Sequence, residues 1–311
     1  MAPAMGAIQR RSVACAAAVA ALAMGCAAPD VEVDPAAMTA EIEAWRAQHE
    51  ADYRRAWVTI AGLHFLDPGA QTAGSGADSD IVLPPPVPAT LGSFVLEGQT
   101  VRFEPTPGAD VTLKDARVTE PVVLKDDGSG SADQLTSGTV KMAVHVSGER
   151  RSLRVWDPEG PLARGFKGFT WFPIQLDQRV TGRFIPDADP RTVRVTNTFG
   201  DLDTFTTEGV VEFSLGGRTL RLRPFTTRPK RFYIVFKDAS SGAETYEAAR
   251  FLYADLGGDG SVVLDFNQAY NPPCAFNPYT TCPIPLPENR LPVKVLAGER
   301  AYPEHVKLPA P

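Results

Sequence analysis

The spacing of apolar positions along the chain changes near residue 58, and this change predicts where a helix ends and a β-rich body begins. Over residues 35–57, apolar and aromatic side chains recur every three to four positions, the spacing of one helix face. Asp34 offers an N-cap, and Pro35 suits the first helical position. The face consists of Ile42, Trp45, His49, Tyr53 and Ala56. We expect an amphipathic N-terminal helix over residues 35–57 that packs on the body of the protein.

From residue 58 onward the chain consists of short runs in which apolar and polar residues alternate, separated by glycine, proline and aspartate. Such alternation is typical of strands with one buried face. The fold class that we expect is mainly β, with the helix followed by two antiparallel β-sandwich or barrel-like subdomains. The sequence places these subdomains at residues 58–148 and 149–311.

The first subdomain carries a spaced pattern made of Leu66, Pro68, Gly69, Gly74 and Asp80–Pro84. This pattern resembles the opening of a forkhead-associated domain, a β-sandwich that binds phosphothreonine. Ser75, however, stands where that family places its phosphate-binding arginine, and a dianionic phosphate needs such charge-assisted donors. The resemblance therefore implies a sandwich shape without phosphopeptide binding.

The densest pattern of the chain lies near its C-terminus, where prolines, asparagines and two cysteines follow a predicted strand. Prolines and asparagines at such density predict a fixed loop rather than a linker. The pattern comprises Phe236–Asp238, Glu244–Tyr246, Arg250–Leu252, Asp265–Asn267, Ala269–Cys274 and Ala297–Glu299. It resembles a bacterial and archaeal family known as domain of unknown function 1684, over about Trp45 to Arg300. The resemblance implies no established activity and no catalytic residues.

The N-terminal residues have the pattern of an export signal. Arg10 and Arg11 precede an apolar run, Val13–Met24, that is too short to span a bilayer and leads into small residues. We therefore expect residues 1–25 to be a signal peptide and residues 26–34 to be a tether.

The end of this segment, Leu22–Cys26, is similar to a lipobox, although Leu22 lies four rather than three positions before the cysteine. We expect a lipid on Cys26 and a protein anchored in the cell envelope, at the outer membrane and facing the periplasm in a Gram-negative host. The alternative is cleavage by ordinary signal peptidase, which would give a soluble periplasmic protein.

Two cysteines, Cys274 and Cys282, remain after removal of the signal peptide and acylation of Cys26. An oxidising compartment and a turn-forming segment between them favour a disulfide. A metal site is the weaker interpretation, because two thiols without a nearby histidine do not complete a tetrahedral ligand set. We predict a disulfide, no metal and no cofactor.

Charge and motif content exclude several classes of function. The chain has 31 Lys and Arg against 37 Asp and Glu, a net charge of −6, and no concentrated basic face that would predict a nucleic-acid partner. The sequence contains no nucleophile elbow, Walker loop or zinc-binding His-Glu-x-x-His pattern. Its histidines are His49, His64, His145 and His305. They are far apart, so a histidine-based site would have to be assembled by tertiary contacts.

Polar residues gather around the C-terminal pattern. On strands, Tyr246 shares a face with Arg250, and Asp265 with Asn267, because side chains of one parity point the same way. Two interpretations remain open: a buried hydrogen-bonded network that fixes the loop, and a ligand pocket beneath the loop. The candidate residues are Asp238, Glu244, Tyr246, Arg250, Asp265, Asn267, Tyr270, Asn271, Asn289 and Arg290.

The function that we expect is that of an envelope lipoprotein that binds a small polar ligand, a glycan or a partner protein at this loop. The alternative is a hydrolase that uses carboxylates such as Asp238, Glu244, Asp265 or Glu299 as acid and base. Carboxylates beside arginines are more simply explained as ion pairs, which favours binding.

Overall fold

The computed structural model describes residues 34–303. The predicted signal peptide, Cys26, nearly all of the predicted tether and His305 lie outside the described residues. Within residues 34–303, strands make up most of the regular structure and form several mainly antiparallel sheets, none of which closes into a barrel, which confirms a mainly β fold. None of the helices within residues 34–303 has both the length and the apolar character that a membrane crossing requires.

The predicted N-terminal helix is present. Helix α1 spans Pro35–Tyr53 and continues as one π-helical turn, Arg54–Val58, so the predicted end at residue 57 is correct to within one residue. Met38, Ile42 and Tyr53 are buried, and the last two belong to the predicted face. A second, short helix α2 spans Pro161–Gly165. Single 3-10 turns lie at Asp127–Ser129, Leu176–Gln178, Phe266–Gln268, Pro273–Ala275 and Pro287–Asn289.

The first half of the chain forms a β-sandwich. One sheet has the strand order β1-β11-β10-β9-β6-β7 and the other β3-β2-β4-β5-β8, and both contribute to one hydrophobic core. Neighbouring strands are antiparallel except β2 and β3, which are parallel. The strands are β1 (Ile60–Phe65), β2 (Gly69–Gly74), β3 (Ile81–Val82), β4 (Gly92–Glu97), β5 (Thr100–Pro105), β6 (Thr112–Leu113), β7 (Ala116–Arg117), β8 (Val122–Leu124), β9 (Gln134–Ser137), β10 (Val140–Ser147) and β11 (Arg150–Trp156).

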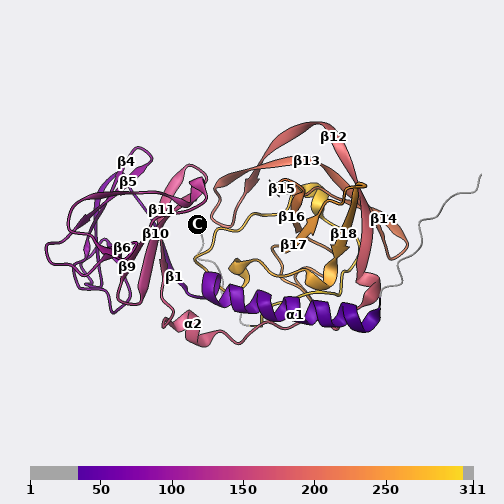
Figure 1. The fold of residues 1–311 in the computed structure, drawn as a ribbon, viewed down its shortest axis with the longest axis horizontal. Helices are drawn as coiled ribbons and strands as arrows, with labels where there is room; N and C mark the ends of the chain where they lie inside the picture. Colours follow the sequence, from indigo (N-terminus) through magenta and orange to yellow (C-terminus); the bar gives the residue numbers. More distant parts are fainter. Residues whose placement is uncertain (1–33, 304–311) are drawn as a thin grey trace, which may run out of the picture. The chain divides into compact units, whose positions relative to one another are not determined.

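The second half contains a four-stranded sheet, β14-β13-β12-β18, and a three-stranded sheet, β15-β16-β17. A second hydrophobic core lies between them and takes residues from both. Figure 1 shows α1 running beside these C-terminal strands. The strands are β12 (Arg179–Thr196), β13 (Leu202–Leu215), β14 (Arg218–Leu222), β15 (Phe225–Arg228), β16 (Arg231–Phe236), β17 (Arg250–Asp255) and β18 (Ser261–Asp265).

The two faces of the three-stranded sheet serve different cores. On β16, Phe232, Ile234 and Phe236 point into the core between the sheets, whereas Tyr233 and Val235 point into a third, aromatic core beneath α1. This division follows from the period-two geometry of a strand. The face that carries Tyr233 forms one wall of the candidate site.

The two halves are held together by polar contacts. The Ser147 hydroxyl and the Arg150 guanidinium both donate to Asp201, at 2.6 and 2.7 Å. The Asn277 amide donates to the carbonyl of Ile60 at 2.8 Å. The first sandwich continues through β11, beyond the predicted boundary at residue 148, and the division into two subdomains stays a prediction.

Candidate functional site

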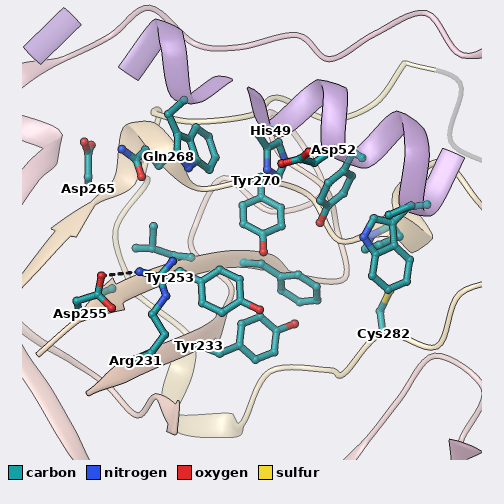
Figure 2. A pocket seen from close by; sticks show the side chains of 18 of the residues that line it. His49, Asp52, Arg231, Tyr233, Tyr253, Asp255, Asp265, Gln268, Tyr270 and Cys282 are labelled. Atoms are coloured by element: carbon teal, nitrogen blue, oxygen red, sulfur yellow. Dashed lines mark hydrogen bonds and ion pairs between the residues drawn. The ribbon is translucent and has the colours of Figure 1, made fainter. Parts of the chain in front are cut away.

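A cavity of about 850 Å³ lies between α1, the three-stranded sheet and the C-terminal loop (Figure 2). Its helical wall consists of Trp45, His49, Tyr53 and Trp57. These residues are spaced by four, so they form one stripe along the helix. The rings contact each other in sequence: the centroids of Trp45 and His49 are 4.7 Å apart, and those of His49 and Tyr53 are 4.3 Å apart.

The sheet wall of the cavity is built from cross-strand pairs of β16 and β17. Tyr233 lies opposite Tyr253, and their rings stack with centroids 5.1 Å apart. Arg231 lies opposite Asp255, and its Nη1 donates to Oδ2 of that residue at 2.5 Å. Phe251 completes this face. Antiparallel register therefore fixes both the aromatic surface and the charged pair at its edge.

The loop contributes Tyr270, which is central to the cavity. A two-way backbone hydrogen bond with Phe251, at 2.8 and 3.0 Å, holds the loop against β17 at this point. The Tyr270 ring lies 4.5 Å from the His49 ring, centroid to centroid. Figure 2 shows Tyr270 between His49 of the helix and Tyr233 of the sheet. The predicted site residue Tyr270 thus joins the helical wall to the sheet wall.

The imidazole and tyrosine side chains that line the cavity are uncharged at neutral pH. Burial lowers the pKa of His49 to about 4, although Asp52 and Glu50 act in the opposite direction, so the imidazole is neutral. Burial also raises the pKa of Tyr53, Tyr233 and Tyr270 well above that of an ordinary tyrosine. Neutral rings with hydroxyl and imidazole groups can stack and form hydrogen bonds without demanding a charged ligand.

The charged residues that line the cavity have polar partners. Arg179 donates to Glu41 and to Asp265, both at 2.7 Å. Asp52 accepts hydrogen bonds from Arg55 and from Gln48. Among residues 34–303, no three His, Cys, Asp and Glu side chains are grouped so that they could hold a metal ion.

Three of the residues predicted from the sequence, Asp265, Tyr270 and Cys282, line the cavity. Most of the others belong to a buried network away from it. Asp238 and Arg250 form an ion pair at 2.6 Å with fully buried side chains. Arg250 also donates to the carbonyl of Ala297, at 2.6 Å.

Two of the predicted asparagines, Asn267 and Asn289, are buried and form hydrogen bonds with the backbone of distant segments. The Asn267 amide donates to the Gln175 carbonyl and to Asp265, and that of Asn289 donates to the carbonyls of Arg223 and Val235. These side chains satisfy backbone groups that would otherwise be buried without partners.

The remaining predicted residues also have structural contacts. Glu244 pairs with Lys294, and the Tyr246 hydroxyl donates to the Cys274 carbonyl. Arg290 is exposed and lines a separate shallow pocket on the four-stranded sheet.

Asn271 and Glu299 form the innermost pair of the network. The backbone N–H and the side-chain amide of Asn271 both donate to the Glu299 carboxyl group, at 2.8 Å each. Burial raises the pKa of Glu299 to about 8. The neighbouring Gly298 has a φ of +78°, and a Cβ there would lie 2.2 Å from the carbonyl oxygen of Ala269. Only glycine therefore fits beside Glu299.

Cys274 and Cys282 are free, buried thiols in the structure, and residues 34–303 contain no disulfide, in contrast to the one that the sequence predicts. The Cys274 N–H donates to Sγ of Cys282 at 3.4 Å, and the Tyr246 hydroxyl contacts Sγ of Cys274 at 3.6 Å. These contacts give each sulfur a hydrogen-bonding partner without a covalent bond between the two cysteines. Pro273, Thr281 and Cys282 nevertheless line the cavity, so both ends of this loop reach the site.

The sequence prediction missed most of the cavity wall. The helical stripe was visible as aromatic residues at a spacing of four, but we interpreted it only as a packing face. The sequence does not mark the strand residues as cavity residues. The alternation of a strand does not show which of its faces packs in a core and which lines a cavity. The missed residues are Trp45, His49, Tyr53, Trp57, Arg179, Arg231, Tyr233, Tyr253, Asp255 and Gln268.

Two solved structures show similarity to parts of the chain. An uncharacterized protein from gene locus rrnAC0354 of Haloarcula marismortui, solved by solution NMR, is 29% identical, with a TM-score of 0.40, over 48% of this chain and 85% of that chain. A structure from an analysis of phosphothreonine-dependent FHA domain interactions is 18% identical, with a TM-score of 0.22, over 30% of this chain and 93% of that chain. Both TM-scores are too low to support an argument about the fold.

A comparison with curated proteins found no match. A comparison with protein families found one over the C-terminal half, which contains both sheets of that half and the loop. The matched range begins well after Trp45, where the resemblance was expected to start. Residues 164–300 match the family described as "Protein of unknown function (DUF1684)", which confirms the resemblance that the C-terminal pattern indicated.

Proposed function

We propose that this protein binds a small, uncharged ligand with a flat ring face, such as a sugar or an aromatic ring, in the cavity beneath α1. The observation that carries the proposal is the combination of a volume of about 850 Å³ with walls of neutral aromatic and imidazole rings. Ligand sites are commonly concave, of this size, and lined by aromatic side chains with few polar groups. Tyrosine hydroxyls would orient the ligand, and ring stacking would hold it.

The arrangement of carboxylates favours binding over the alternative of a hydrolase that uses them as acid and base. Asp238 is paired with Arg250, Asp265 with Arg179, and Glu244 with Lys294. Glu299 is fully buried and hydrogen-bonded to Asn271. A general acid and base must reach the substrate, and paired or buried carboxylates do not offer that reach.

Tryptophan fluorescence provides the test, because two of the four tryptophans, Trp45 and Trp57, line the cavity. We expect at least one probe from a panel of methyl glycosides and simple phenols to change the emission saturably. Tyr253→Ala should weaken that binding about tenfold, since it removes one stacking surface at an exposed site.

Tyr279→Ala, at a half-buried tyrosine outside this cavity, is the matched control and should keep the wild-type affinity. Binding that is insensitive to Tyr253→Ala, or an absence of saturable change with every probe, would contradict the proposal.

We also propose that the protein acts in the cell envelope, attached by a lipid on Cys26. The basic residues, short apolar run and Gly-Cys junction of the N-terminal sequence support this. In cells that express the full chain, Cys26→Ser should move the protein from the membrane fraction to the soluble fraction, whereas Cys15→Ser should not. Membrane association that survives Cys26→Ser would refute lipid attachment at this position.

A further inference from the structure

Three residues that are distant in sequence meet beside the cavity in the order acid, imidazole, hydroxyl. Nδ1 of His145 lies 2.5 Å from Oδ2 of Asp127, and Nε2 of His145 lies 2.8 Å from Oγ1 of Thr281. Asp127 comes from a 3-10 turn, His145 from β10 and Thr281 from the C-terminal loop. Thr281 also lines the cavity.

The hydrogen-bond pattern fixes the roles of the two imidazole nitrogens. Burial raises the pKa of Asp127, but the hydrogen bond and charge of His145, the backbone N–H of Val146 and the charge of Arg154 together outweigh it and keep this pKa below its ordinary value. The backbone N–H of Val146 donates to the other carboxylate oxygen at 2.8 Å. An ionised carboxylate only accepts hydrogen bonds, so Nδ1 carries a proton, and Nε2 of the neutral imidazole then accepts from the Thr281 hydroxyl.

We propose that Thr281 is a nucleophile activated by His145 and oriented through it by Asp127, and that the protein cleaves carboxylic esters. Catalytic triads are recognised by such geometry and not by chain order or fold. The inference rests on the proposed function in one respect: the ring-bearing part of the physiological ester would occupy the aromatic cavity that Thr281 lines.

The reaction balances with water as the only co-reactant. Oγ1 of Thr281 bonds to the ester carbonyl carbon while its proton passes to Nε2 of His145. The bond from that carbon to the alcohol oxygen then breaks, and the alcohol takes the proton from Nε2. Water attacks the acyl-threonine and gives a proton to Nε2, the bond to Oγ1 breaks, and the proton returns to Oγ1. The products are a carboxylic acid and an alcohol.

A buried cation beside the triad can stabilise the developing negative charge. The Arg154 guanidinium lies 3.8 Å from Asp127 and 5.8 Å from the ring centroid of Trp57, which lines the cavity. Its Nε is buried and has no hydrogen-bond partner among the described residues. The positive charge of this guanidinium would favour a tetrahedral oxyanion formed beside the triad.

The test uses p-nitrophenyl acetate, a small ester activated by its good leaving group. Wild-type protein should release p-nitrophenolate above the buffer rate, and Thr281→Ala and His145→Gln should each lower kcat about 100-fold or more. Thr281→Ser should retain activity, and the double variant should be no slower than either single variant, because the residues act as a unit.

Thr226→Ala, at a hydroxyl on β15, is the matched control and should keep the wild-type rate. Acid quenching during turnover should trap an acetylated peptide that contains Thr281. Wild-type hydrolysis at the buffer rate, or full activity in folded Thr281→Ala, would overturn the triad. The fluorescence titration reports on the cavity and this hydrolysis assay reports on the triad, so failure of the cavity and failure of the triad give different results.

Discussion

Replacing Arg250 by methionine should lower the free energy of unfolding by about 3–5 kcal/mol, the usual cost of leaving a buried charge without its partner. The side chains of Arg250 and Asp238 are both 0% exposed. The variant would leave the Asp238 carboxylate uncompensated and the carbonyls of Val295 and Ala297 without their donor. Urea denaturation followed by fluorescence measures the change.

Arg231→Met is the matched control on the neighbouring strand of the same sheet. Its ion pair with Asp255 is open to solvent, with side-chain exposures of 34% and 67%, so its loss should cost less than about 1 kcal/mol. Adding Asp238→Asn to Arg250→Met should recover part of the loss, because it removes the stranded charge. If Arg250→Met and Arg231→Met lowered the free energy of unfolding equally, the burial of the ion pair would not determine how much its loss destabilises the protein.

Raising the pH from about 6.5 to about 8.5 should destabilise the wild-type protein by roughly 2 kcal/mol through Glu299 alone. The ordinary glutamate pKa is 4.5, and burial raises that of Glu299 to about 8 in the folded state. Between these values the folded protein holds one more proton than the unfolded chain, so stability falls as pH rises and becomes constant above the folded pKa. Glu299→Gln cannot ionise and should lack this loss.

His49 offsets only a small part of this loss. Its pKa falls from 6.5 to about 4 on folding, so stability rises with pH until the imidazole is neutral in the unfolded chain as well, a gain of about 0.4 kcal/mol between pH 6.5 and 8.5. A glutamine at the exposed Glu97 should retain the wild-type pH dependence. Parallel curves for wild type and Glu299→Gln, measured by urea denaturation, would show that Glu299 is ionised in the folded protein.

The sequence was sufficient for the fold class and for the helix because both depend on local periodicity. The stripe from Ile42 to Ala56 and the change of period near residue 58 correspond to α1 and to the strands that follow it. The sandwich boundary was harder to place. Strand β11 follows β10 through a tight turn and pairs with it, but nothing in the local pattern of Arg150–Trp156 shows to which half it belongs.

The site was only partly predictable because it is assembled by long-range pairing. The high density of polar residues around the C-terminal pattern correctly indicated Asp265 and Tyr270. Most of the other residues that it indicated belong to the buried network, as Asn271 does through its hydrogen bonds to Glu299. Buried polar residues that satisfy the backbone have the same composition as a polar binding site. His145 and Thr281 are 136 residues apart, and no local sequence pattern indicates that they are in contact.

The alternation of side chains along β16 means that one strand register determines both a wall of the cavity and part of the core. Odd-numbered positions, Arg231, Tyr233 and Val235, face the aromatic side, and the even-numbered positions fill the space between the sheets. An insertion of one residue before Tyr233 would exchange the two faces at once. The lining of the cavity can therefore change by substitution at the odd positions, whereas a one-residue change in the length of β16 would disrupt the core as well.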